Sequence, residues 1–307
     1  MNEFFRNAFP VDMLIRKPAE AAKNRFDVII IGGGVYGIML TLEASLKGLS
    51  PLLLEQADFG QYTSTNSLRI IHGGFRYLQN LDIPRLLESS EERSFFLKTF
   101  PELVRPIDCV MPLYGEGFRR PSFLFLAHVL YNLLTSGKNK GLPSQSQIQK
   151  GKILSPAATR KAIPEVISQG LKGAVQWQDG FAPDSQRVLM ESLRLAAKNG
   201  AVSLNYMEAT DLLTRNGKVQ GVRAVDRDSG EQHDFFSKCI INSAGPWCRL
   251  LAARFHKDIP HLFHSTLAWN ILFNRPAPTD FALAVAPRKP KARTYFLVPY
   301  KGRLFAG

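Results

Sequence analysis

The stretch RFDVIIIGGGVYGIMLTLEASLKGLSPLLLE, residues 25–55, decides the fold of this chain. Its first seven residues, 25–31, are rich in β-branched apolar side chains and run into three glycines, which predicts a strand buried on both faces that enters a tight turn. Apolar residues then recur at helical spacing over 35–47, and Gly48 stands where that helix should end. Residues 51–55 predict the next strand. The whole stretch therefore predicts a complete βαβ unit.

Three glycines of this stretch have the spacing of a dinucleotide-binding turn. In Gly32-x-Gly34-x-x-Gly37 the first glycine allows the tight turn, the second lets a pyrophosphate approach backbone amides, and the third permits close helix–strand packing. The N-terminus of the following helix then faces the phosphates. Glu55 ends the second strand, where an acid can accept hydrogen bonds from a ribose diol. Strand, helix and acid together predict a dinucleotide site, but they do not choose between FAD and NAD.

Further helices and strands are expected along the rest of the chain. Amphipathic spacing predicts helices over 81–100 and 184–198, the second with Asp184 as its N-cap. A β-meander of three strands is expected, joined by polar turns that contain Gly217 and Gly230. The predicted strands of the meander cover 201–213, 219–227 and 232–242. Two later strands are predicted over 266–273 and 295–298.

Composition and charge narrow the function classes. With 307 residues, 45% hydrophobic and 21% charged, the chain has the composition of an ordinary folded protein. Lys and Arg outnumber Asp and Glu by 39 to 26, which favours anionic partners. No zinc-ligand spacing, RNA-binding aromatic signature or long basic block is present, so no nucleic-acid partner is expected. Three widely spaced cysteines without a CxxC predict a reducing, cytoplasmic compartment rather than a disulfide framework.

One apolar segment bears on membranes. Residues 122–134, SFLFLAHVLYNLL, are flanked by Arg119, Arg120, Lys138 and Lys140. The segment is too short to span a bilayer. A buried core helix is the favoured interpretation, because short apolar runs more often pack inside proteins. The alternative is peripheral docking on the inner face of a membrane, which the basic residues on both sides of the segment would favour.

A longer motif follows the βαβ unit. Residues 63–78 read TSTNSLRIIHGGFRYL. This block resembles the T-S-x-x-S…H-G-G-x-R-Y-L block of the flavin-dependent glycerol-3-phosphate dehydrogenases, within the D-amino-acid-oxidase-like superfamily. Three later segments are similar to that family in the same order: DSQR at 184–187, NSAGPW at 242–247, and residues 296–307. The resemblance covers about residues 26–307 and selects FAD as the dinucleotide.

The resemblance implies an α/β fold with a Rossmann-like FAD-binding domain that carries a β-meander, interleaved with a strand-rich substrate domain of the D-amino-acid-oxidase-like type. The expected FAD-binding domain is discontinuous, over 26–115 and 180–260. The substrate domain is expected over 116–179 and 261–307, and residues 1–25 form an N-terminal extension. Because Gly307 falls inside the family's G-T-T-D motif, the sequence is expected to be a C-terminally truncated piece of a longer protein.

The resemblance also implies cofactor contacts outside the glycine motif. Hydroxyls and amides of the 63–67 segment are expected near the flavin, and the backbone at Glu208 near the adenine. Gly245 and Pro246 are expected to bring the last meander strand against the pyrophosphate. The predicted cofactor-binding residues are Gly32, Gly34, Gly37, Glu55, Thr63, Ser64, Ser67, His72, Gly73, Glu208, Ala209, Gly245, Pro246 and Trp247.

The implied reaction is hydride transfer from a small anionic hydroxy substrate to the flavin, with a membrane quinone as a possible acceptor. The predicted catalytic residues are His72, Arg76, Tyr77 and Asn270. Arg76 is favoured for the anionic group, because a guanidinium binds phosphate or carboxylate bidentately. A surface ion pair is its alternative. Three roles are open for His72: it orients the flavin edge, it relays a proton, or it is a core histidine whose ring nitrogens are hydrogen-bonded within the protein.

One position departs from the family. Where the family carries a K-G-S-H run whose histidine is a candidate general base, residues 267–270 read LAWN, and Asn270 cannot accept a proton as that histidine could. Two alternatives therefore stay open: a flavin enzyme for amino acids, amines or 2-hydroxy acids, and a truncated chain that binds nucleotide without turnover. His256, His261 and His264 lack a carboxylate at ligand spacing, so no metal is expected.

Overall fold

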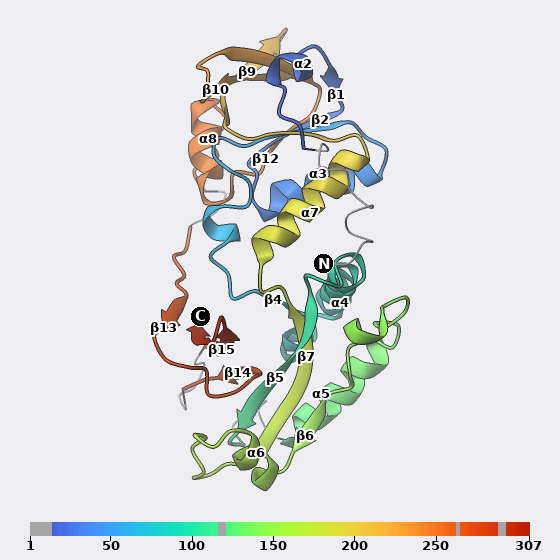
Figure 1. Ribbon diagram of the computed structural model, residues 1–307, viewed down its shortest axis with the longest axis vertical. Coiled ribbons are helices and arrows are strands. Elements are labelled where there is room, and N and C mark those ends of the chain that lie inside the picture. Colours follow the sequence, from blue (N-terminus) through green and yellow to red (C-terminus); the bar gives the residue numbers. More distant parts are fainter. Residues whose placement is uncertain (1–13, 116–120, 262–264, 288–292) are drawn as a thin grey trace. The chain divides into compact units, whose positions relative to one another are not determined.

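The computed structural model describes residues 14–115, 121–261, 265–287 and 293–307 (Figure 1). The chain divides into two compact units. Unit 1 comprises Met1–Asn66 and Ser185–Leu267, and unit 2 comprises Ser67–Asp184 and Ala268–Gly307. The chain therefore leaves unit 1 after the βαβ stretch and returns to it at the predicted 184–198 helix.

Unit 1 contains two four-stranded sheets and the helices beside them. In chain order its elements are α2 (Pro18–Ala21), β1 (Arg25–Phe26), β2 (Val28–Ile31), α3 (Val35–Leu46), β3 (Pro51–Leu54), η2 (Tyr62–Ser64), α7 (Ser185–Lys198), β8 (Val202–Leu204), β9 (Met207–Arg215), β10 (Lys218–Asp226), β11 (Gln232–Ser237), β12 (Ile240–Asn242), η6 (Gly245–Trp247) and α8 (Cys248–Arg254).

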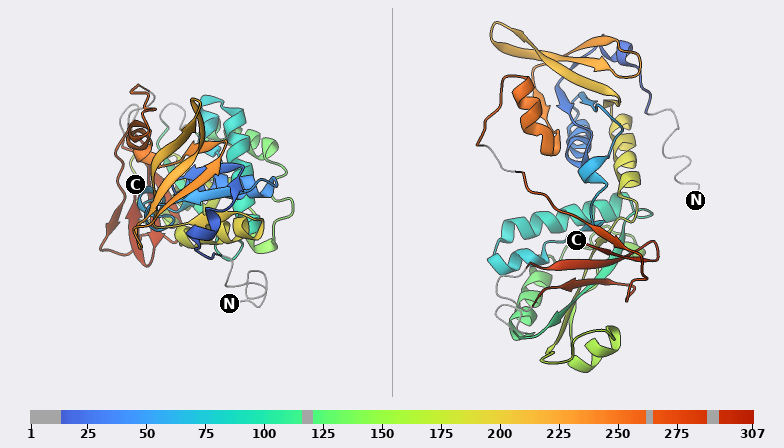
Figure 2. Two further views of the ribbon diagram at one scale, coloured as in Figure 1. Left: turned by 90° about the horizontal axis from the view of Figure 1, so that it is seen from above. Right: turned by 90° about the vertical axis from the view of Figure 1, so that its left-hand side faces the viewer.

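The parallel sheet of unit 1 has the strand order β12-β2-β3-β8 and is buried on both faces. Because successive strand residues point to opposite faces, Val28 and Ile30 pack on α3 and α7, whereas Ile29 and Ile31 pack on the meander. This double burial explains why β2 and β3 are continuous apolar runs. The meander forms the second sheet, in which β9, β10 and β11 pair antiparallel as predicted (Figure 2).

Three predicted strands are each divided between the two sheets of unit 1. The 25–31 run forms β1, which pairs with β11, and then β2, which pairs with β3. At the break, Asp27 turns outward and its carboxylate accepts a hydrogen bond from the Ser50 amide at 2.8 Å. The predicted 201–213 strand breaks at Tyr206, which has φ of 50°, and the 232–242 strand breaks between β11 and β12. Apolar pattern alone did not mark these changes of sheet.

Unit 2 is built on one eight-stranded sheet whose main path is β13-β16-β15-β14-β5-β7-β4, with β6 paired to β7. Its elements are β4 (Ile70–Ile71), η3 (Phe75–Asn80), α4 (Ile83–Thr99), β5 (Arg105–Leu113), α5 (Pro121–Leu134), η5 (Ser144–Ser146), β6 (Lys152–Leu154), α6 (Pro156–Ala162), β7 (Gly173–Phe181), β13 (Ile271–Phe273), β14 (Ala282–Val285), β15 (Tyr295–Tyr300) and β16 (Arg303–Ala306).

The apolar 122–134 segment forms helix α5, which is half core and half surface. Tyr131 is buried in the main core of unit 2, and Leu130 and Leu134 pack against that core. Leu126, Val129 and Leu133 are exposed. Within the described ranges no helix is long and apolar enough to cross a membrane. The core interpretation therefore holds for one face of α5, and the other face is open.

The compact units differ from the expected domain boundaries. Residues 67–115 were expected in the FAD-binding domain, but they lie in unit 2 because β4 and β5 both pair with β7, with Ile70 opposite Phe181 and Cys109 opposite Trp177. Non-local strand pairing of this kind leaves no mark in the local sequence pattern. The assignment of one unit to FAD and the other to substrate stays a prediction.

Candidate functional site

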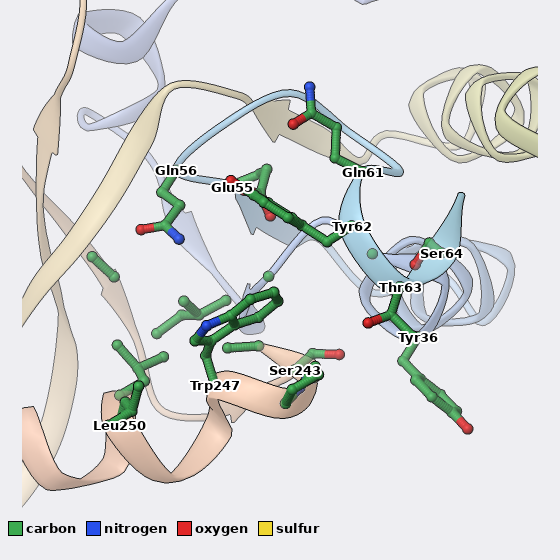
Figure 3. A pocket seen from close by; sticks show the side chains of 18 of the residues that line it. Tyr36, Glu55, Gln56, Gln61, Tyr62, Thr63, Ser64, Ser243, Trp247 and Leu250 are labelled. Atoms are coloured by element: carbon green, nitrogen blue, oxygen red, sulfur yellow. The ribbon is translucent and has the colours of Figure 1, made fainter. Parts of the chain in front are cut away.

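Unit 1 contains a cavity of about 760 Å³, a volume typical of ligand sites (Figure 3). It lies at the N-terminal end of α3 and is closed on other sides by the η2 segment, the start of β9 and the η6–α8 segment. The predicted cofactor-binding residues that line it are Gly32, Gly34, Glu55, Thr63, Ser64, Glu208, Ala209, Gly245, Pro246 and Trp247. The structure thus gathers these widely separated residues around one cavity.

Two glycines of the turn are fixed by close backbone contacts. Gly32 has φ of +111°, and a Cβ there would meet the Ser243 carbonyl oxygen at 2.5 Å. At Gly37, which does not line the cavity, a Cβ would collide with the carbonyl oxygen of Gly32, so α3 can approach β2 only with glycine at this position. These contacts match the first and third roles of the glycine motif.

Gly34 has a different environment, because it borders the cavity. It is the N-cap of α3 and provides no capping side chain. The Val35 amide donates a hydrogen bond to the Ser64 hydroxyl at 2.8 Å, so the predicted serine is tied to the helix N-terminus. The positive end of the helix dipole therefore faces a cavity bordered by glycine and hydroxyl groups, which suits a pyrophosphate.

Glu55 has a structural task at the end of β3. One carboxylate oxygen accepts a hydrogen bond from the Gly33 amide at 2.6 Å, and the other accepts one from the Ala57 amide at 2.8 Å. Each carboxylate oxygen can accept a second hydrogen bond. Glu55 therefore holds the glycine turn while keeping acceptor capacity toward the cavity that it lines.

Another part of the cavity wall carries paired charges. Glu208 accepts hydrogen bonds from Arg254 at 2.7 Å and from Arg227 at 2.8 Å. The hydrogen bond from Arg254 lowers the pKa of Glu208 against the effect of burial, and Arg227 lowers it further. Arg254 also lines the cavity and was missed by sequence reasoning, because its position on α8 belongs to no motif.

Trp247 and Tyr62 form an aromatic pair at the cavity wall. Their ring centroids are 5.0 Å apart in an edge-to-face arrangement, and Figure 3 shows the two side chains next to each other. Trp247 was predicted from the NSAGPW segment. Tyr62, which has φ of 57°, was not, although it directly precedes the predicted Thr63.

The other predicted cofactor residues, Ser67, His72 and Gly73, belong to unit 2. The His72 Nδ1 lies 3.3 Å from the Asp179 Oδ2, and the His72 ring centroid lies 5.4 Å from that of Phe296. The Gly73 amide donates a hydrogen bond to the Asp179 Oδ1 at 2.7 Å. A Cβ on Gly73 would collide with the Arg93 guanidinium, so this glycine gives space to a buried arginine.

Asn270 lies in the same part of unit 2 as His72. Phe296, the ring neighbour of His72, exchanges two backbone hydrogen bonds with Gly307 at 2.9 and 3.1 Å. The Asn270 side-chain oxygen faces Gly307. Two residues predicted as catalytic, 198 positions apart in sequence, are thus brought to one end of the β15–β16 region.

The remaining predicted catalytic residues lie on η3. The Arg76 backbone is part of this 3₁₀ helix, but its side chain is outside the described part of the structure. Tyr77 packs partly buried against the core, and the Arg85 guanidinium lies 5.7 Å from its ring centroid. Among the described residues no group of three or more His, Cys, Asp or Glu could hold a metal, and His264 lies outside them.

The comparisons with known proteins agree on one family. The family model described as "FAD dependent oxidoreductase" matches residues 27–307. The chain is 30% identical to a glycerol-3-phosphate dehydrogenase from Synechocystis sp., over 95% of this chain and 53% of the relative. It is 30% identical to an alpha-glycerophosphate oxidase from Streptococcus pyogenes, over 92% of this chain and 45% of the relative. The chain spans about half the length of these curated relatives.

A solved structure supports the fold alone. A glycerol-3-phosphate dehydrogenase from Bacillus halodurans, complexed with FAD, aligns with a TM-score of 0.67 at 22% identity. The alignment covers 94% of this chain and 48% of that chain.

Proposed function

Because the chain belongs to the family of FAD-dependent oxidoreductases, we propose that the cavity of unit 1 holds FAD and that the whole protein oxidises a small anionic hydroxy compound. The family and the fold class expected from the 63–78 motif are confirmed by the family match and the structural likeness. The observation that carries the proposal is the cavity at the α3 N-terminus, bordered by Gly32 and Gly34. When bound, FAD supplies the hydride acceptor.

The residues of unit 1 fit such a dinucleotide. Gly34 and the α3 N-terminus would hold the pyrophosphate, because backbone amides and the helix dipole favour a negative group there. Glu55 would accept hydrogen bonds from the ribose, since it keeps free acceptor sites on its carboxylate. Glu208 and Ala209 would border the adenine. The Tyr62–Trp247 pair offers apolar aromatic surface to the remainder of the cofactor.

A substitution at Gly34 tests this placement. A Cβ at Gly34 would have the Ser64 hydroxyl as its near neighbour, at 3.0 Å, so a larger side chain extends into the cavity that Gly34 lines. We expect Gly34→Leu to fold but to lose bound flavin. The measurement is the absorbance of the purified protein at about 450 nm, where oxidised flavin absorbs. Gly137→Leu is the matched control, because among the described residues other than its chain neighbours none has an atom within 4 Å of a Cβ there. Unmodified protein that stays colourless with FAD yet binds NAD tightly would contradict the cofactor assignment.

In unit 2 we propose that His72 takes the proton of the substrate hydroxyl and that Arg76 binds the anionic group. His72 is partly exposed, with one ring nitrogen committed to Asp179, so the other is available to a substrate. The names of the relatives and the net charge of +13 favour glycerol 3-phosphate or a similar anion. Tyr77 and Asn270 complete the proposed substrate side.

Anaerobic flavin bleaching tests the substrate. The panel is glycerol 3-phosphate, 2-hydroxy acids, D-amino acids and N-methyl amino acids, and we expect bleaching by anions. A general base contributes about a hundredfold or more. Because His72 is proposed as that base, Asn270→His is not expected to speed bleaching by glycerol 3-phosphate, and a gain of about a hundredfold would place the base at position 270 instead. Bleaching by uncharged amines alone would contradict the role of Arg76. A yellow protein that no substrate bleaches would favour the second candidate, a chain that binds FAD without turnover.

We also propose peripheral docking on an anionic membrane, with a quinone as the electron acceptor. The support is the open face of α5, where Leu126, Val129 and Leu133 are exposed, together with the exposed Lys140 that follows it. Such a face binds through apolar burial and attraction to acidic lipid. Co-sedimentation with phosphatidylserine vesicles that falls with added salt, and is lost in Leu133→Asp, would support docking. Equal sedimentation with neutral vesicles would contradict it.

A further inference from the structure

A buried carboxylate stands directly behind His72 in unit 2. Asp179 lies on β7, where residues 175, 177, 179 and 181 share the face that is buried in the main core. Its side chain is 3% exposed. A carboxylate in such a place has to be surrounded by hydrogen-bond donors, because an unpaired buried charge is very costly.

Three donors surround Asp179. The Gly73 amide donates to its Oδ1 at 2.7 Å, and the Trp177 indole donates to its Oδ2 at 3.0 Å. The third partner is the His72 Nδ1, 3.3 Å from the same Oδ2. Since an ionised carboxylate only accepts hydrogen bonds, this geometry favours the imidazole form that carries its proton on Nδ1.

A buried arginine also faces this carboxylate. Arg93 is 0% exposed, and its Nη1 lies 3.6 Å from the Asp179 Oδ1. The same Nη1 donates to the Tyr131 hydroxyl at 3.1 Å, and that hydroxyl donates to the Gly73 carbonyl at 2.9 Å. Burial alone would raise the pKa of Asp179, but the hydrogen bond and charge of His72, followed by Arg93, hold it below its ordinary value.

The outer edge of His72 is open. The imidazole is 39% exposed while its Nδ1 faces the buried carboxylate. With the proton held on Nδ1, the lone pair on Nε2 is the basic site of the neutral ring. A ring that was free to rotate or to change tautomer would present that lone pair only part of the time.

We propose that Asp179 is a positioning residue, which fixes His72 in orientation and in the Nδ1–H tautomer so that Nε2 is the proton acceptor. The inference rests on the proposed function in one respect, namely that His72 accepts the substrate proton. In the step, the substrate O–H proton would move to Nε2, and FAD, when bound, would supply the acceptor for the C–H hydride. His72 then becomes an imidazolium, whose charge Asp179 balances.

Asparagine at 179 separates positioning from packing. Asn has the shape of Asp, but one of its two acceptor oxygens becomes an NH₂ donor. If its remaining oxygen still accepts the hydrogen bond from the Gly73 amide, its NH₂ group points at the Trp177 indole N–H and at His72. His72 would then have to offer a lone pair at Nδ1 and carry its proton on Nε2, which is the wrong tautomer for a base at Nε2.

The first measurement is the tautomer itself, by ¹⁵N NMR of the histidine-labelled full chain at about pH 8.5, where an ordinary imidazole is neutral. His72→Gln identifies the signals of His72. We expect Nδ1–H in the unchanged protein and Nε2–H, or a mixture, in Asp179→Asn. Nε2–H in the unchanged protein would overturn the proposal even if the variant did not fold.

The second measurement is flavin reduction by the best substrate of the panel. We expect Asp179→Asn to lower the rate constant of reduction by about 10²-fold, the usual contribution of a general base, with a smaller change in the substrate concentration needed for half-saturation. Glu191→Gln is the control, because Glu191 is another buried carboxylate, 2% exposed and paired with Arg187 at 2.6 Å, but it lies in unit 1. Its rate and the His72 signals should not change.

The two hypotheses fail in different ways. If no substrate reduces the flavin but Asp179→Asn still changes the His72 tautomer, the proposed function fails and the positioning role stands. If the flavin is reduced and neither the tautomer nor the rate responds to Asp179→Asn in folded protein, the positioning role is wrong. Trp177→Phe removes one donor from Asp179 and should retain the Nδ1–H form.

Discussion

The two candidate sites of this protein are built from different material. One part of the cavity of unit 1 is formed by backbone: a glycine turn and the amides at the N-terminus of α3, with a carboxylate that holds the turn. The cluster behind His72 in unit 2 is formed by side chains with charge, above all Asp179 and Arg93. A site built from glycine backbone is disturbed when a side chain is added, whereas a cluster of charged side chains is disturbed when one partner is removed. The two should therefore respond differently to substitution.

The largest effect is expected at Gly37. A Cβ there would collide with the Gly32 carbonyl oxygen, and backbone on both sides leaves little room to relax. We expect Gly37→Val to cost more than the roughly 1–3 kcal/mol typical of overpacked sites, so that unit 1 does not fold. Folding is measured by circular dichroism and urea unfolding.

Gly137→Val is the matched control for this change, since a Cβ at Gly137 would have nothing within 4 Å in the described part of the chain apart from its own neighbours in sequence. It should leave the unfolding curve unchanged. A folded Gly37→Val protein of ordinary stability would show that α3 can move away from β2 at little cost.

Arg93 gives the second largest effect, and it tests the side-chain cluster. Arg93→Met keeps an apolar stem of similar length but leaves Asp179 without its buried cation. Breaking a buried pair in this way costs about 3–5 kcal/mol, which corresponds to a fall in Tm of roughly 10 °C for a domain of this size.

Arg223→Met is the comparison variant for Arg93→Met. Arg223 pairs with Asp234 at 2.7 Å, but the two side chains are 43% and 35% exposed to water. Solvent screens such a pair, so its loss should not change Tm measurably. Equal losses at Arg93 and Arg223 would mean that the buried cluster contributes no more than a surface pair.

The same contrast explains how much of each site could be predicted from the sequence. The glycine turn and Glu55 occur within residues 32–55, because a dinucleotide site built on one βαβ unit is local in sequence. Asp179 lies 107 residues from His72, and Arg93 lies 38 from Tyr131. No local pattern connects positions so far apart. Only non-local strand pairing and the packing of α4 bring them together.

A weaker signal for the cluster was nevertheless present. Residues 175, 177 and 181 are apolar and alternate along β7, which places Asp179 on the core face of that strand. On α4 the buried positions are Leu86, Ser90, Arg93 and Leu97, so an arginine lies within the apolar stripe. A charge of each sign on a core face predicts a buried pair. The sequence did not say which acid meets which base.

The strand boundaries have a similar explanation. The 25–31 run was predicted as one strand because every residue after Arg25 except Asp27 suits a buried strand. The structure turns the chain at Asp27 so that β1 joins the meander and β2 joins the parallel sheet. The polar residue inside the apolar run was the available sign of the break.

The smallest effect is expected in the stability of the protein at low pH, where Asp179 can be compared with Glu208. Both carboxyl groups have pKa values held below the ordinary ones, so their contributions to stability are complete above the pKa of the unfolded chain and are lost as pH falls through the folded value. For Asp179 this loss begins below about pH 3.8, the ordinary value for an aspartate. One group changes the slope of unfolding free energy against pH by at most about 1.4 kcal/mol per pH unit.

Salt should separate the two groups. The Glu208 pairs with Arg227 and Arg254 involve arginine side chains that are 46% and 49% exposed, so 1 M salt, with a screening length of about 3 Å, should remove most of their contribution. Arg93 and Asp179 are buried and should be screened far less. Urea unfolding between about pH 2 and 5, with and without salt, measures this. In 1 M salt Asp179→Asn should still reduce the dependence of the unfolding free energy on pH, and Glu208→Gln should not, because salt leaves only the buried ion pair unscreened. The opposite result would place the stronger electrostatic interaction in the cavity of unit 1.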